Sequence, residues 1–175
     1  MKCINCKKES EIKIRDKNFC KNCFIKVFER KIFRTIKHYK MFSKKDKLGL
    51  LKDKNYLIIL NILKKITDKR KQKIKLISKP QKNLKIILSE NLDDIAITAL
   101  SNYLNNKSAK INPVNKRFII PLYFCSDEEI QAYSKFKNIK ISFKRDKLKK
   151  LLSKIEAKYP GTKNSIVNSY LQSLK

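Results

Sequence analysis

Four of the five cysteines form two close pairs near the N-terminus, as Cys3-x-x-Cys6, thirteen residues, then Cys20-x-x-Cys23. Each C-x-x-C turn presents two thiolates on one side of a knuckle, and four thiolates in a tetrahedron are the ligands of a structural zinc ion. The pattern therefore predicts a zinc site in which no coordination position is left for catalysis. Two disulfides are the alternative, which a reducing cytoplasm disfavours.

The segment between the two knuckles, "SEIKIRDKNF", is short enough to form one hairpin. Ile12 and Ile14 alternate with charged residues, as in a strand with one buried face, and Asp16-Lys17-Asn18 is the expected turn. The hairpin would hold the two cysteine pairs together.

Two other reactive side chains occur without obvious partners. Cys125 lies in "PLYFCSDEEI", where apolar neighbours favour a small buried hydrophobe over a reactive thiol. His38 is the only histidine and has no catalytic partner nearby in the sequence, so it is assigned to a basic surface.

The charge balance is the strongest compositional feature. The chain has 44 Lys and Arg against 15 Asp and Glu, a formal net charge of +29. Codon bias in an AT-rich genome also enriches lysine, but it would enrich glutamate as well. The excess therefore predicts a polyanionic partner, and the predominance of lysine favours contact with backbone phosphates over reading of bases.

A helix is expected after the second knuckle, because Ile25, Phe28, Ile32, Ile36 and Tyr39 recur at steps of three and four residues. Basic residues follow similar steps on another side of this helix. They are the predicted RNA contacts, although a solvated helix face is the alternative: Lys26, Arg30, Arg34, Lys37 and Lys40.

Glycine is scarce, with only Gly49 and Gly161 in 175 residues. Loops that cradle phosphate bring backbone amides close to the ligand, which side chains obstruct. The segment 46–66 has the strand, turn and helix of a phosphate-binding unit, yet its turn, 51–56, contains no glycine. This composition argues against an enzyme that uses a nucleotide by itself.

The remaining periodicity alternates between strands and helices. Strands are expected at 48–51, 74–78, 84–89, 118–124 and 139–143, and helices at 55–67, 91–106, 126–136, 146–158 and 163–174. Residues 107–117 are expected to form a loop, and Pro121 should place its strand at a sheet edge or end at that point. The fold class is therefore α/β with a mostly parallel sheet. No apolar stretch is long enough to cross a membrane, so a cytoplasmic protein without a membrane partner is expected.

Four segments, in order along the chain, resemble one family. "CINCKKESEIKIRDKNFCKNCFIKVFERKIFRTIKHYKMF", "SENLDDIAITALSNYL", "IIPLYFCSDEEIQAYSKFKNI" and "IEAKYPGTKNSIVNSYLQSL" are similar to motifs of the TtcA/TtuA-type tRNA 2-thiouridine synthetases. The resemblance implies a small N-terminal zinc finger followed by a reduced Rossmann-like (PP-loop/HUP-type) sheet with flanking helices. It divides the chain into a finger at 1–24, a basic connecting helix at 25–45 and a truncated α/β domain at 46–175.

Departures from the family pattern are equally informative. The family's Ser-Gly-Gly-Lys-Asp-Ser loop is replaced by "LKDKNY", in which Lys54 falls on the loop lysine. The family segment with a further Cys-x-x-Cys is missing, as is a later catalytic cysteine. Asp93 and Asp94 match carboxylates linked to ATP and metal, but acidic residues at a helix N-terminus also stabilise it. These three residues are vestigial candidates, and both ATP and an iron–sulfur cluster are predicted to be absent.

Three functions follow from this pattern. The first is a non-catalytic paralogue that binds tRNA, an active tRNA-thiolation subunit, or both. The second is a tRNA sulfurtransferase subunit completed in trans by a partner, and the third is a general RNA-binding zinc protein. An intact thiolation paralogue or a second copy of this chain are the candidate protein partners.

Overall fold

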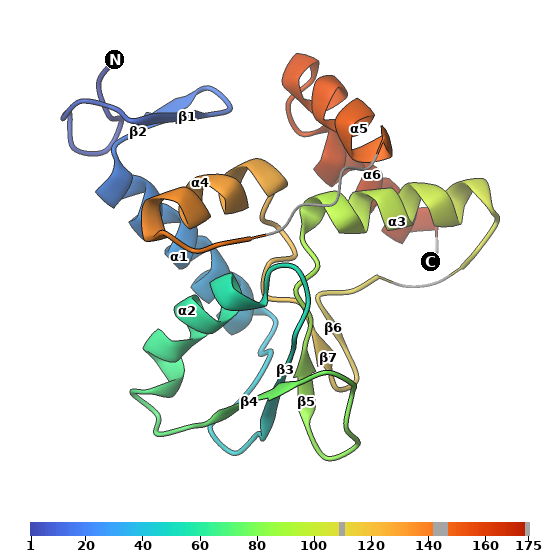
Figure 1. Cartoon of the computed structure of the whole chain (residues 1–175). Helices are drawn as coiled ribbons and strands as arrows, with labels where there is room; N and C mark the ends of the chain where they lie inside the picture. Colours follow the sequence, from blue (N-terminus) through green and yellow to red (C-terminus); the bar gives the residue numbers. More distant parts are fainter. Residues whose placement is uncertain (109–110, 142–146, 174–175) are drawn as a thin grey trace.

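The computed structural model describes residues 1–108, 111–141 and 147–173. Two short strands and a long helix come first, and an α/β body follows (Figure 1). The strands are β1 (Ile12–Ile14), β2 (Lys17–Phe19), β3 (Leu48–Leu51), β4 (Ile74–Ile77), β5 (Lys85–Ile87), β6 (Val114–Asn115) and β7 (Phe118–Ile119). The helices are α1 (Lys21–His38), α2 (Tyr56–Thr67), α3 (Leu92–Leu104), α4 (Asp127–Lys137), α5 (Lys147–Lys158) and α6 (Thr162–Ser173).

The main sheet has the order β4-β3-β5-β7-β6. β4, β3, β5 and β7 are parallel to their neighbours, and β6 is antiparallel to β7. The chain leaves β3 through α2 toward β4 on one side, and it leaves β5 through α3 toward β7 on the other. The carboxyl ends of β3 and β5 thus flank a topological switch point, the usual place for a site in open α/β sheets.

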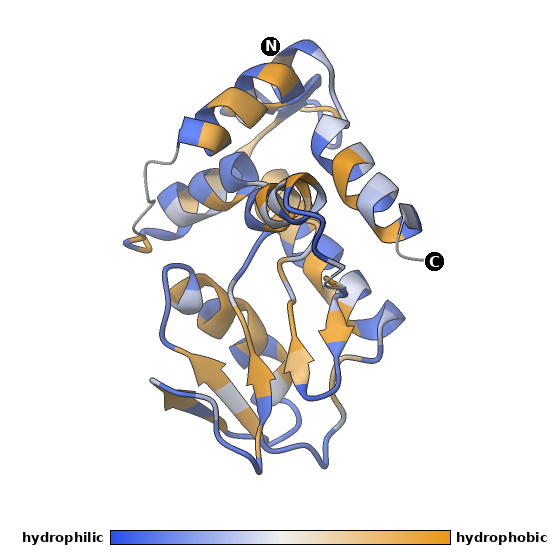
Figure 2. Cartoon of the chain, turned by 90° about the vertical axis from the view of Figure 1, so that its right-hand side faces the viewer, coloured by the Kyte–Doolittle hydropathy of each residue, from blue (hydrophilic) through white to orange (hydrophobic). Residues whose placement is uncertain are grey.

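Two hydrophobic clusters hold the elements together. The larger one joins β3, β5 and β7 to α1, α2 and α4, and it includes Ile14 and Phe19 of the β1–β2 hairpin. The smaller one joins α3, α5 and α6 through side chains such as Leu92, Leu152 and Val167. The two groups of helices lie on opposite sides of the molecule in Figure 1, and the strands of the main sheet, in the lower half of both views, are mainly hydrophobic in Figure 2.

Helix boundaries follow local chemistry. Asn91 caps α3 in a capping box with Asp94, and Ser126 caps α4 in a capping box with Glu129. Between α5 and α6 the chain turns at Gly161, whose φ of +99° is disfavoured for residues with a Cβ. Both helices therefore begin at a residue whose side chain accepts a hydrogen bond from a backbone amide of the first turn.

A buried carboxylate ties three helices together. Glu29 on α1 is only 8% exposed. Lys65 Nζ on α2 lies 2.6 Å from its Oε2, and the Tyr133 hydroxyl on α4 donates to its Oε1 at 2.8 Å. The charge is thus compensated by an ammonium group and a hydroxyl, so α1 is fixed against the body by polar as well as apolar contacts.

Several sequence expectations are wrong in detail. The hairpin turn lies at Arg15 and Asp16, because Lys17 and Asn18 already pair with β1. Residues 107–117, expected as a loop, contain β6, so β6 is the sheet edge and β7 is internal. β7 stops at Ile119, which is shorter than the expected strand but agrees with the alternative that the strand ends near Pro121. Residues 139–141 are not in a strand, and the rest of that expected strand lies outside the described residues.

Replacing Tyr133 with phenylalanine should lower the free energy of unfolding by about 1.5–3 kcal/mol, because a buried carboxylate loses a hydroxyl donor. Urea unfolding at constant metal content would measure this. Tyr103→Phe is the matched control, since Tyr103 is 64% exposed. Equal stabilities of the two variants would show that the Glu29 network contributes nothing.

Candidate functional site

The first candidate site is a cluster of four thiols. The Sγ atoms of Cys3, Cys6, Cys20 and Cys23 all lie within 4.8 Å of one another. The β1–β2 hairpin brings the pairs together, and the second pair stands at the start of α1, where Cys20 is the N-terminal flanking residue. The cysteines predicted as ligands therefore form one cluster that could bind a metal.

The spacing of the thiols limits what they can hold. A single ion with sulfur bonds of about 2.3 Å in a tetrahedron keeps its ligands about 3.8 Å apart. Cys6 Sγ and Cys20 Sγ are 3.5 Å apart, close to that value. In a four-iron cluster each cysteine binds a different iron, which separates the thiolates further. The four thiols therefore fit one metal ion better than an iron–sulfur cluster.

The second candidate site lies at the switch point between β3 and β5. Here the segment after β3 is bonded to the segment after β5. The Ser89 hydroxyl donates to the Asp53 carboxylate, and Asn55 Nδ2 donates to the Ser89 carbonyl oxygen at 3.1 Å. Partial burial raises the pKa of Asp53 above its ordinary value. The Asp53 carboxylate and the side-chain amide of Asn55 thus lie where a nucleotide-binding turn would hold a phosphate.

Four backbone amides of this turn have internal acceptors. The amide of Lys52 donates to the carbonyl of Ile77, extending the pairing of β3 with β4. The amide of Asp53 donates to the Leu51 carbonyl, that of Asn55 to the Ser89 hydroxyl, and that of Tyr56 to the Asp53 carbonyl. These four N–H groups are consequently directed at the protein itself.

Asp94 is held by two lysines from distant parts of the chain. Its Oδ1 lies 2.5 Å from Lys54 Nζ and 2.7 Å from Lys149 Nζ. Lys149 also reaches Asp127 Oδ2 at 2.9 Å, so one ammonium group bridges two carboxylates. Burial raises the pKa of Asp94, but the hydrogen bonds and charges of Lys149 and Lys54 outweigh it and hold that pKa below 3.8.

Asp93 has a lysine of its own. Its side chain is fully buried and pairs with Lys163, which is 4% exposed and stands in the first turn of α6. Its other oxygen accepts the backbone amide of Asp127 at 2.9 Å. The lysine of the "PGTK" motif therefore neutralises the first aspartate of the "NLDD" motif.

The structure brings together all three vestigial candidates, Lys54, Asp93 and Asp94, at this switch point. Sequence reasoning missed Lys149 and Asp127, which complete the network. Asp127 follows the last parallel strand and could have been found from that position. Lys149 is one of many lysines in α5, and nothing in its neighbourhood in the sequence distinguishes it.

The other predicted residues are not part of this site. All five predicted RNA contacts are exposed, along α1 and just after it: Lys26, Arg30, Arg34, Lys37 and Lys40. Cys125 is 1% exposed and burial raises the pKa of its thiol, which fits a buried hydrophobe. Among residues 1–108, 111–141 and 147–173, no helix combines the length and hydrophobicity of a membrane span.

Comparison with known proteins agrees with the motifs. No protein-family model matches the chain. A probable sulfurtransferase of Methanocaldococcus jannaschii is 31% identical over 108 residues, which is 51% of this chain and 31% of that protein. A tRNA-cytidine(32) 2-sulfurtransferase of Pseudomonas fluorescens is 33% identical over 102 residues, 49% of this chain and 37% of that protein. Over about half of its length, this chain is thus similar to curated sulfurtransferases. It spans about a third of the length of these curated relatives.

The fold of this chain resembles a solved structure, the U34-tRNA thiolase NcsA from Methanococcus maripaludis with its [4Fe-4S] cluster. The TM-score is 0.72 at 18% sequence identity, over 99% of this chain and 88% of that one. The likeness establishes the α/β fold of the PP-loop type. The expected fold class is therefore confirmed.

Replacing Lys149 with glutamine should raise the pKa of Asp94, because burial then acts against one ammonium group instead of two. With its lowered pKa, Asp94 contributes stability that is present above pH 3.8 and is lost as the pH falls through the folded-state pKa. The variant should lose part of this contribution. Carboxyl-carbon NMR titration of Asp94 would measure the shift.

Lys150→Gln is the matched control for this titration. Lys150 is the exposed neighbour of Lys149, and its replacement removes the same charge. The Asp94 pKa should stay close to the wild-type value in that variant. Equal shifts in both variants would mean that overall charge, and not the Lys149 contact, determines the Asp94 pKa.

Proposed function

We propose that this chain is a non-catalytic paralogue of the TtcA/TtuA-type tRNA sulfurtransferases that binds tRNA, an active tRNA-thiolation subunit, or both. The observation that carries the proposal is the ion-pair network at the switch point. Lys54, at the position of the family's loop lysine, is engaged by Asp94, and Asp93 and Asp94 are both neutralised by lysines of this chain. The groups that could hold a nucleotide and its metal are bonded to one another.

The turn after β3 supports the same conclusion. A phosphate-binding turn needs free N–H groups that point at the anion. Here the amides of Lys52, Asp53, Asn55 and Tyr56 have acceptors within the chain, and the Asp53 carboxylate would repel a phosphate. The residues at the positions of the family's ATP site therefore do not fit ATP, and the proposal involves no step that uses ATP.

An iron–sulfur cluster also does not fit the cysteines of this chain. The five cysteines comprise the N-terminal cluster of four and the buried Cys125. The four clustered thiols lie too close together for a cubane and suit a tetrahedral ion. We assign zinc to Cys3, Cys6, Cys20 and Cys23 because thiolates are its preferred ligands in closed structural sites. The ion would hold the hairpin against the start of α1.

The purified protein should contain one zinc ion per chain and negligible iron, as measured by elemental analysis after anaerobic preparation. Cys6→Ser should lower zinc affinity and loosen the hairpin, seen as loss of amide protection in β1 and β2. Cys125→Ser is the control, since Cys125 lies outside the cluster and should not alter metal content. One cluster equivalent of iron and sulfide in place of zinc would contradict the assignment.

The basic face of α1 is the proposed tRNA contact. Lys26, Arg30 and Arg34 follow one another at steps of four residues and are exposed, whereas Phe24, Phe28 and Ile32 pack in the core. Lysine and arginine on a rigid helix suit the phosphate backbone of a folded RNA, which is recognised largely by shape. The excess of positive charge in the whole chain would add a long-range attraction.

Replacing Lys26, Arg30 and Arg34 together with glutamine should weaken tRNA binding by about tenfold or more and flatten its dependence on salt. Each lost phosphate contact lowers the slope of log K against log salt by about one. The control replaces exposed Lys69, Lys79 and Lys82, which removes the same charge elsewhere. Equal losses in the two variants would show that α1 is not a specific contact.

Two alternatives predict different behaviour. A subunit completed in trans would bind ATP only together with an intact paralogue, and calorimetry with and without that partner would reveal it. A general RNA-binding zinc protein would bind any structured RNA as tightly as tRNA and would not co-purify with a thiolation subunit. An affinity pull-down that yields neither tRNA nor such a subunit would overturn the leading proposal.

A further inference from the structure

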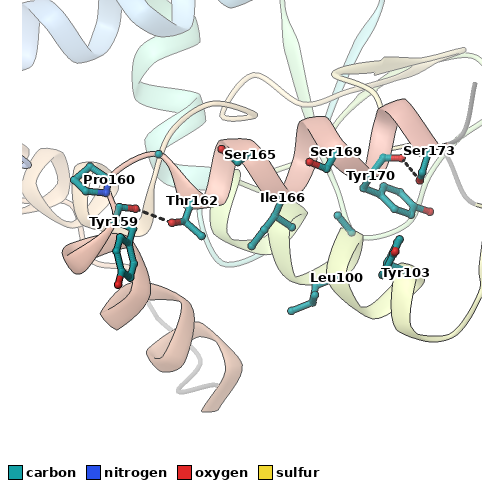
Figure 3. A pocket seen from close by; sticks show the side chains of 12 residues that line it. Leu100, Tyr103, Tyr159, Pro160, Thr162, Ser165, Ile166, Ser169, Tyr170 and Ser173 are labelled. Atoms are coloured by element: carbon teal, nitrogen blue, oxygen red, sulfur yellow. Dashed lines mark hydrogen bonds between the residues drawn. The ribbon is translucent and has the colours of Figure 1, made fainter.

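A groove on the side of the molecule away from α1 is not used by the proposed site. It lies between the C-terminal half of α3 and the segment from Tyr159 through α6, and it has a volume of about 670 Å³. Figure 3 shows Tyr159 near one end of α6 and Tyr103 near the other, with Leu100 and Ile166 between them. Its volume lies within the range of small-molecule sites.

The two tyrosines at this groove are unusually exposed for aromatic side chains. Tyr103 is 64% exposed and Tyr159 is 59% exposed. Aromatic rings of this size normally bury most of their surface, so two exposed rings bordering one groove indicate a binding surface. Between them the apolar floor of Leu100 and Ile166 offers a flat contact to another ring.

The backbone that carries Tyr159 is held by hydrogen bonds within the chain. Its amide donates to the Ile155 carbonyl at 2.7 Å, and its own carbonyl accepts the Thr162 hydroxyl at 2.7 Å. Glu156 then accepts the amides of Gly161 at 3.0 Å and Lys163 at 2.9 Å, which closes the turn around Pro160. A rigid aromatic side chain loses little entropy when a ligand stacks on it.

The charge around the groove favours an anionic ligand. Among the described residues, none of those that line it is acidic. The Lys158 ammonium lies 5.4 Å from the centre of the Tyr159 ring, and the exposed Lys107 follows α3, where its carbonyl accepts the Tyr170 hydroxyl. A second copy of this chain, at +29, would bring like charge to the same place. An RNA strand supplies bases that can stack on the tyrosine rings and phosphates that can pair with the lysines.

We infer that this groove binds an unpaired nucleotide of RNA, whose base stacks on Tyr103 or Tyr159 while lysines contact the flanking phosphates. Stacking on exposed aromatic side chains beside basic residues is how single-stranded segments and loops are bound, and it does not require a base sequence. Ser165 and Ser169 also line the groove and offer hydroxyl groups to a base edge or a ribose. The inference rests on the proposed RNA-binding role and assigns its single-stranded contact.

The test measures binding of a short single-stranded RNA and of a blunt duplex with the same number of phosphates, by fluorescence anisotropy. At least one of Tyr103→Ala and Tyr159→Ala should weaken single-strand binding by about tenfold, the effect of one lost stacking contact, and both should leave duplex binding within about twofold of wild type. Tyr103→Phe and Tyr159→Phe keep the ring and should bind like wild type. Leu104→Ala removes exposed apolar surface without a ring and is the control.

The outcomes separate this inference from the proposed function. If the alanine variants bind the single strand as tightly as wild type while the α1 variant loses affinity, the groove assignment is wrong and the tRNA-binding role stands. If the wild-type protein binds no RNA, the groove assignment and the tRNA-binding part of the proposed function are both wrong. Photocross-linking with iodouridine-substituted RNA should label Tyr103 or Tyr159. Labelling confined to residues outside the groove would overturn the inference.

Discussion

Carboxylates at the ends of parallel strands, each neutralised by a lysine from elsewhere in the chain, are the constraint on which this structure depends. Asp93 is fully buried, and a buried charge without a partner costs several kcal/mol. Lys163 satisfies it from α6, and Lys149 satisfies Asp94 and Asp127 from α5. The network therefore fixes the two C-terminal helices over the start of α3, and with them the groove that lies between α3 and α6.

The same network separates fold from chemistry. A Rossmann-like sheet places its strand ends at a switch point whether or not a ligand binds there. In this chain the strand–turn–helix form is kept, but the carboxylates and backbone amides at the switch point are bonded to lysines and to acceptors within the chain. Under the proposed function these polar groups serve the structure, and the exposed surfaces of α1 and of the α3–α6 groove are the parts that would contact a partner.

These two surfaces differ in physical character. The α1 face is basic and exposed, and its contacts with phosphate would be sensitive to salt. The groove is lined by apolar and hydroxyl groups between two exposed tyrosines, so its contacts would depend on stacking. A folded RNA with both paired and unpaired regions presents the two kinds of ligand in one molecule, and a chain of this size could use both without a catalytic centre.

The sequence by itself determined the elements with strong local signals. Periodicity placed β3, α2 and α5 to within a residue, and the cysteine spacing identified the four-thiol cluster, because each of these depends on neighbours a few positions away. The tertiary structure alone decided which charges meet. Lys149 and Asp94 are far apart in the sequence, and one lysine among so many carries no local mark of its partner. β6 and the groove were likewise decided by long-range packing, since a two-residue strand and a gap between distant helices have no periodicity to read.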